Sequence, residues 1–151
     1  MNTPVSYKLA KLLKEKGFDK GCVANWWILA KDHSDNYKNN QPLDESKIFF
    51  AANREEYDNM VQIDNDTEHN AYHVLGCPTI AEVVMWLYEK RGIWVAVDAG
   101  INGFHAHYKV NPIGRLSSNL KQGWVNDESN PLPSPKEAYE TAIKYCLTKL
   151  I

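Results

Sequence analysis

The sequence predicts an α+β fold, with a small antiparallel sheet of three to five strands packed by three main helices. Two capped helix starts and a strand pair joined by a glycine-containing turn lead to this class. The chain has 151 residues, of which 44% are hydrophobic and 24% charged, as in ordinary globular proteins. We therefore expect a single domain over residues 1–151.

The first helix is expected to begin at Pro4, because Thr3 can act as its N-cap and proline suits the first helical position. Gly17 is expected to end it. Phe18 should then fold back over the apolar stripe of this helix.

The other two helices have clearer starts. Thr79 and Glu82 fit the S/T-x-x-E capping box, and Gly92 supplies the stop for that helix. Ser134 and Pro135 mark the start of a last helix that runs to the C-terminus. Apolar residues of the middle helix recur at helical spacing at Ile80, Val83, Val84, Leu87 and Tyr88.

Runs of β-branched and aromatic residues predict the strands. They cover residues 21–30, 47–52, 93–98, 104–110 and, with a weaker pattern, 120–125. Asn102-Gly103 indicates a hairpin between two of these runs. Residues 53–70 fit either a short helix around 55–60 or a strand at 60–64, and their Asp and Asn content favours turns.

Charge and hydropathy narrow the class of partner. The formal charge of −2 creates no field that would attract nucleic acid or an anionic membrane, so nucleic acid is disfavoured. The N-terminal segment lacks the apolar core of a signal peptide, and no apolar run is long enough to cross a bilayer. We expect a cytoplasmic protein that does not bind membranes.

Three segments, CPTIAEVVMWLYEKRGIWVAV, GFHAHYKV and SPKEAYETAIKYCLTKL, follow one another in the second half of the chain. In this order they resemble small uncharacterised proteins of bacterial genomes and prophages, which have a PT-x-AE helix, a hairpin and a terminal S/T-P-x-EA helix. The resemblance implies a fold and a phage or mobile-element origin, and it carries no activity. The terminal helix after a hairpin is also loosely similar to HicB-type antitoxins, which would imply toxin or nucleic-acid partners.

Four histidines are candidate metal ligands. His69 and His73 are four residues apart, so on a helix their rings would share one face. His105 and His107 are two apart on a predicted strand, which also places both rings on one side. A solvated strand face also explains the second pair. One functional alternative is therefore a metal-binding protein or a metal-dependent hydrolase.

Motifs for catalysis and cofactors are missing from the sequence. It has no GxSxG elbow, HExxH helix, Walker loop or dinucleotide-binding loop. The three cysteines stand far apart and form no CxxC pair, so we expect small buried side chains and no disulfide framework. The sequence favours a non-enzymatic role without a cofactor.

The five tryptophans are the most unusual feature of the composition. Trp26 and Trp27 must point to opposite faces of one strand, and Trp86 lies off the apolar stripe of its helix. Exposed aromatic surface often marks a binding site. The leading hypothesis is an accessory or interaction protein that binds a protein partner, or itself as a homo-oligomer, through a surface containing Trp27, Trp86 and Trp124.

A single-stranded nucleic-acid-binding module is the other alternative. Aromatic side chains on the sheet would stack on unpaired bases, while basic side chains reached the phosphates. The candidates for the phosphate contacts are the lysines of the first helix together with Lys109, Arg115 and Lys121.

Overall fold

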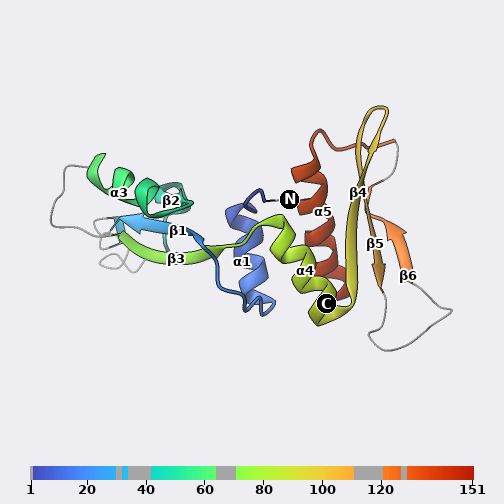
Figure 1. The fold of residues 1–151 in the computed structure, drawn as a ribbon, viewed down its shortest axis with the longest axis horizontal. Coiled ribbons are helices and arrows are strands. Elements are labelled where there is room, and N and C mark those ends of the chain that lie inside the picture. The colour runs from blue at the N-terminus through green and yellow to red at the C-terminus, as the bar shows by residue number, and fades with distance from the viewer. Residues whose placement is uncertain (1, 30–31, 34–41, 64–70, 111–120, 127–128) are drawn as a thin grey trace. The chain divides into compact units, whose positions relative to one another are not determined.

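The computed structural model describes residues 2–29, 32–33, 42–63, 71–110, 121–126 and 129–151 (Figure 1). The chain divides into two compact units. We call residues 20–78 the middle unit, and residues 1–19 with 79–151 the terminal unit. Each contains a three-stranded antiparallel sheet and at least one helix, which confirms the α+β class. A single domain over 1–151 stays a prediction, because compact units need not be domains that fold alone.

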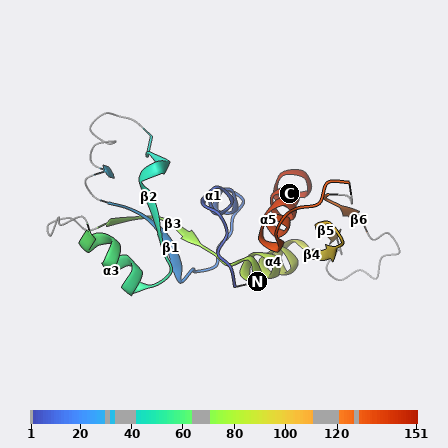
Figure 2. The ribbon, with the colours of Figure 1, turned by 90° about the horizontal axis from the view of Figure 1, so that it is seen from above.

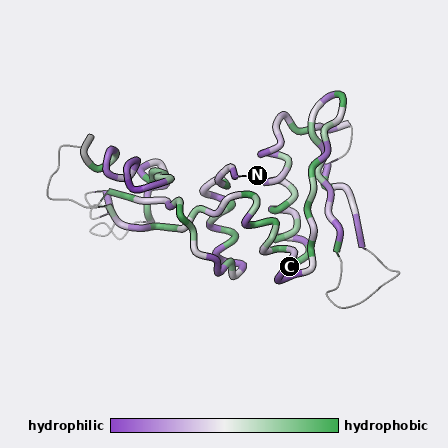
Figure 3. Tube along the Cα trace, in the orientation of Figure 1, coloured by the Kyte–Doolittle hydropathy of each residue, from purple (hydrophilic) through white to green (hydrophobic). Residues whose placement is uncertain are grey.

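The middle unit contains a sheet in the order β2-β1-β3 and the helix α3. The strands are β1 (Ala24–Leu29), β2 (Ile48–Ala51) and β3 (Ala71–Cys77), and α3 spans Arg54–Ile63. The strands expected within 21–30 and 47–52 are therefore present, and the helical alternative for residues 53–70 is confirmed. Figure 3 colours most of α3 as hydrophilic, in keeping with its acidic first turn.

The sequence did not indicate β3, and its backbone explains why. Trp26 of β1 pairs with Leu75 and Trp27 pairs with His73, so Val74 is an extra residue at a β-bulge. A bulge interrupts the alternation of inward and outward side chains from which a strand is recognised. In β3 two exposed residues, Tyr72 and His73, follow one another directly.

The terminal unit contains a sheet in the order β4-β5-β6, with α4 and α5 on the same face of it (Figures 1 and 2). Its helices are α1 (Tyr7–Glu15), α4 (Ile80–Arg91) and α5 (Pro135–Tyr145), the last continued by a π-helical turn at Cys146–Leu150. Its strands are β4 (Ile93–Gly100), β5 (Gly103–Val110) and β6 (Lys121–Trp124). All three strands predicted in this region are present, and the strands that the structure describes form two sheets where one was expected.

The predicted cap residues of α4 and α5 are present. Thr79 and Glu82 form both halves of the capping box, with the Thr79 backbone N–H donating to Glu82 Oε2 at 2.7 Å. Gly92 ends α4 in the left-handed region at φ 64°. Ser134 Oγ accepts a hydrogen bond from the Glu137 N–H at the start of α5.

The first helix begins later than predicted. It starts at Tyr7, with Ser6 as the N-cap residue, and not at Pro4. The reason is a tertiary contact, because the Thr3 carbonyl accepts a hydrogen bond from the Ile80 N–H and Pro4 forms a β-bridge with Thr79. Thr3 and Pro4 are extended where they contact the start of α4, so they cannot also form the first turn of α1.

Trp86 belongs to the core of the terminal unit and not to its surface, which corrects the exposure expected from the helical stripe. Its side chain is 1% exposed, and its ring packs on Phe18 with 5.5 Å between ring centroids. Phe18 folds back after Gly17, as predicted, and its N–H donates to the Leu13 carbonyl. Because this turn covers one flank of α4, the buried arc includes Trp86 and leaves Tyr88 exposed.

No helix among the described residues combines the length and the apolar character needed to cross a bilayer.

Candidate binding surface on the terminal sheet

The β4-β5-β6 sheet has one face covered by helices and one face that we call the open face. On the covered face, Ala106 is fully buried and the Tyr108 ring stacks on Tyr145 of α5 at 5.4 Å. Residues directly opposite each other in antiparallel strands share a face. The strand register therefore places on the open face Trp94, Ala96, Asp98, His105, His107, Lys109, Gln122 and Trp124.

Two tryptophans of the open face are substantially exposed. The side chain of Trp124 is 61% exposed and that of Trp94 is 42% exposed. The Trp94 ring also meets the exposed Tyr88 of α4 edge to face at 5.7 Å. Large aromatic side chains rarely stay in water without a partner, so this exposure marks the open face as a candidate binding surface.

A hollow of about 390 Å³ lies on the open face beside Trp124. The Trp124 ring forms one wall and lies 5.0 Å from the His107 ring, whose Nε2 is 3.2 Å from Asp98 Oδ2. Lys109 and Gln122 also line it. The hollow thus combines an apolar wall with a cation, an anion and an amide, a set that can accept both an apolar and a polar group of a partner.

His105 lies under this surface. It is 8% exposed, and its Nδ1 has no hydrogen-bond partner among the described residues. The ring meets Trp124 edge to face at 6.5 Å. It also passes close to the β4–β5 turn, where a Cβ atom on Gly100 would lie 2.5 Å from His105 Nε2, so a side chain at this position would displace the His105 ring.

Asn126, which sequence reasoning missed, ties the end of β6 to β5. Its Oδ1 accepts a hydrogen bond from the Ala106 N–H at 2.7 Å, and its Nδ2 donates to the carbonyls of Phe104 and Asn130. The Val125 N–H also donates to the Ala106 carbonyl at 2.8 Å. A buried asparagine two residues after the aromatic wall thus fixes the end of β6 against β5. An Asn-rich turn gives no sign of such a role in the sequence.

Of the other two predicted surface tryptophans, neither lies on the open face. Trp86 is buried, as described above, and Trp27 belongs to the middle unit. Trp27 is half-buried, with its ring 4.7 Å from Tyr57 and 5.3 Å from His73. Trp94, which the sequence did not single out, joins Trp124 because both strands present their even-numbered residues to this face.

The four candidate metal ligands fall in different places. His69 and the phosphate-contact candidate Arg115 lie outside the described residues. His73 lies on a strand and not on a helix, and its Nε2 is 3.0 Å from Asn25 Oδ1. His105 and His107 share one side of β5, as predicted. Within the described ranges, no group of three or more histidine, cysteine or acidic side chains has the geometry to hold a metal ion.

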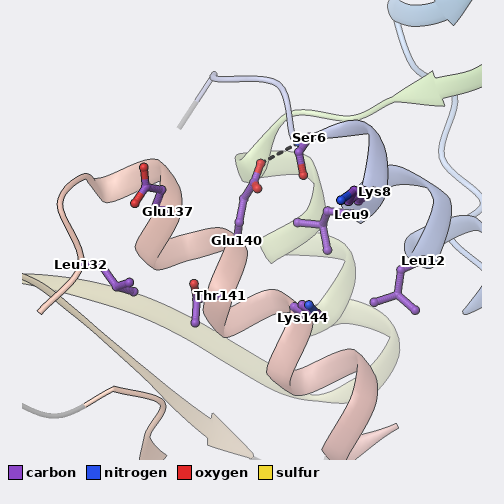
Figure 4. Close-up of a pocket in the computed structure, with 9 residues that line it drawn as sticks. All are labelled: Ser6, Lys8, Leu9, Leu12, Leu132, Glu137, Glu140, Thr141 and Lys144. Atoms are coloured by element: carbon purple, nitrogen blue, oxygen red, sulfur yellow. Dashed lines mark hydrogen bonds between the residues drawn. The ribbon is translucent and has the colours of Figure 1, made fainter. Parts of the chain in front are cut away.

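A second hollow, of about 310 Å³, lies between α1 and α5 of the terminal unit (Figure 4). Leu9, Leu12 and Leu132 supply its apolar lining. At one end the Ser6 N–H donates to Glu140 Oε1 at 2.6 Å, which joins the start of α1 to α5. Lys8, Glu137, Thr141 and Lys144 complete the lining.

Comparisons of the chain with protein-family models, with curated proteins and with solved structures find no match. Its function is therefore inferred from its own residues.

Proposed function

We propose that this chain is a non-enzymatic interaction protein that binds a protein partner through the open face of the β4-β5-β6 sheet. The observation that carries the proposal is the exposure of Trp124 and Trp94 on one face of one sheet. Tryptophan is among the residues that contribute most to the affinity of protein interfaces when a partner covers it.

The hollow beside Trp124 supports a protein partner. Interfaces combine an aromatic centre with a polar rim, and here the rim consists of Asp98, His107, Lys109 and Gln122. Both signs of charge are present, which suits the mixed side chains of a protein surface. The Asn126 hydrogen bonds fix the end of β6 against β5, so less conformational entropy of this backbone is lost when a partner binds.

Site-specific photo-crosslinking in cells that carry the gene tests the proposal. A photoreactive amino acid at Gln122 on the open face is expected to capture one discrete protein. The same group at Lys136, exposed at the start of α5, serves as the matched control and should not capture that protein. The adduct should disappear when Trp124→Ala is added. Equal labelling from both positions, or an adduct that survives Trp124→Ala, would refute the proposal.

Single-stranded nucleic acid is a second candidate, favoured by one observation. Lys109 lines the same hollow as Trp124, so a cation lies beside a ring that could stack on a base. Binding of a fluorescent single-stranded oligonucleotide should then weaken steeply with added salt. A flat salt response, or no binding at low salt, would remove this candidate.

The remaining alternatives stay predictions. Metal binding through His105 and His107, which the described residues do not complete, is tested by metal analysis of the purified protein. A cytoplasmic location and a phage or mobile-element origin depend on the sequence alone.

A further inference from the structure

The charged groups of the hollow beside Trp124 lie at two separate ends of it. Lys109 lies at one end, where the strand register places it directly between Trp94 and Gln122. Asp98 lies at the other end, four residues along β4 from Trp94, which is about 13 Å. Because charges in physiological salt are screened over about 8 Å, Asp98 hardly weakens the field of Lys109.

Only the end at Lys109 has polar groups that are still free to bind a partner. Asp98 Oδ2 already lies 3.2 Å from His107 Nε2. Within the described part of the chain, Lys109 makes no ion pair and the Gln122 side chain no hydrogen bond, and both side chains are exposed. A lysine ammonium donates hydrogen bonds and accepts none. The group that suits this end best is therefore a carboxylate, which forms charge-assisted hydrogen bonds with an ammonium.

We propose that the open face binds a partner segment that presents an acidic side chain to Lys109 and an apolar side chain to Trp124. This inference rests on the proposed function and specifies the chemistry of the partner. Gln122, opposite Lys109, and Trp124 are two residues apart on β6, or about 7 Å. Alternate residues of an extended segment have the same spacing. The acidic and the apolar residue should thus be separated by one residue.

The rest of the open face sharpens this pattern. Trp94 lies directly opposite Lys109, so its ring flanks the bound carboxylate and shields the charge pair from water, which strengthens it. A second acidic residue on the far side of the apolar residue would approach the Asp98 carboxylate and be repelled. The segment should therefore be acidic on one side of its apolar residue and not on both.

An acidic peptide segment fits the hollow better than single-stranded nucleic acid does. Grooves that follow a phosphate backbone are positively charged along their length. The described residues that line this hollow include one lysine, no arginine and a carboxylate at Asp98. One carboxylate can be accommodated at Lys109, whereas a row of phosphates would meet Asp98.

A phage-displayed library of random peptides tests the proposal on the full chain. Peptides are selected on the parent protein, and those that also bind folded Trp124→Ala are discarded. The enriched peptides should contain aspartate or glutamate separated by one residue from a large apolar residue. Enrichment of peptides without this acidic residue would overturn the inference and leave the proposed function standing. If no peptide depends on Trp124, the inference is also wrong, and the crosslinking at Gln122 decides the proposed function separately.

Variants of Lys109 test the role of its charge, with circular dichroism as the check that they are folded. Lys109→Gln should weaken the binding of a selected peptide up to about fivefold, as expected for an exposed charge pair. Lys121→Gln is the matched control, because Lys121 is an exposed lysine of the same sheet that pairs with Val110 and is not on the open face. Fluorescence anisotropy of the labelled peptide measures both. Equal losses in the two variants would contradict the proposal.

Charge exchange gives the most specific result. Selection on Lys109→Glu should enrich lysine or arginine where the parent protein enriches an acidic residue. Added salt should weaken the peptide complex of the parent protein more than that of Lys109→Gln. If Lys109→Glu selects the same acidic peptides, Lys109 does not contact the carboxylate and the inference fails. If a single-stranded oligonucleotide outcompetes the selected peptides at Trp124, the partner is a nucleic acid and the inference is wrong.

Discussion

Replacement of Asn126 by alanine is the sharpest test of how the open face is held together. The side chain joins the end of β6, the middle of β5 and the segment before α5 through hydrogen bonds to Ala106, Phe104 and Asn130. In Asn126→Ala the Phe104 carbonyl keeps the Leu132 N–H as a donor, at 3.0 Å. The Ala106 N–H loses its partner in a buried position, and the Asn130 carbonyl loses the amide that donates to it.

The size of the effect follows from these groups. A buried donor or acceptor left without a partner costs about 1–3 kcal/mol. With one buried N–H and one partly buried carbonyl affected, we expect the free energy of unfolding to fall by about 3 kcal/mol. For a chain of this length that corresponds to a melting temperature about 6–12 °C lower.

Asn130→Ala is the matched control, because Asn130 contributes only its backbone carbonyl to this network and its side chain is exposed. Both variants are compared with the parent chain by urea unfolding followed by circular dichroism. If the two variants unfold at the same urea concentration, the Asn126 network does not stabilise the sheet and the reasoning fails.

Three further predictions concern α4 and α5. Thr79→Ala removes the capping box and should lower the free energy of unfolding by about 1 kcal/mol in urea, whereas Thr141→Ala, at an exposed site, should change it little. Trp86→Ala should cost about 3–5 kcal/mol, and Trp86→Phe clearly less, because phenylalanine keeps the ring contact without the buried indole N–H, which has no partner among the described residues. Burial raises the pKa of the Cys146 thiol to about 12. The thiol therefore ionises in the unfolded chain at lower pH, so stability should fall as pH rises from about 9 toward 12, and less so in Cys146→Ala.

Local chemistry made the helix starts of α4 and α5 predictable. A capping box depends on side chains within a few residues of one another, so Thr79 and Ser134 could be assigned from the sequence. The start of α1 could not, because it depends on the bond between the Thr3 carbonyl and the Ile80 N–H, two groups far apart along the chain. Trp86 shows the same limit, since Phe18 covers it from another segment.

The candidate site was predictable only where it depends on the local pattern of a single strand. Alternation along a strand placed His105 and His107 on one side and allowed an exposed Trp124. The sequence indicated the β4–β5 hairpin but not the pairing of β5 with β6. It therefore missed Trp94 as a companion of Trp124 on the open face and Asn126 as the residue that ties the end of β6 to β5. The bulge at Val74 similarly hid β3 and the strand environment of His73.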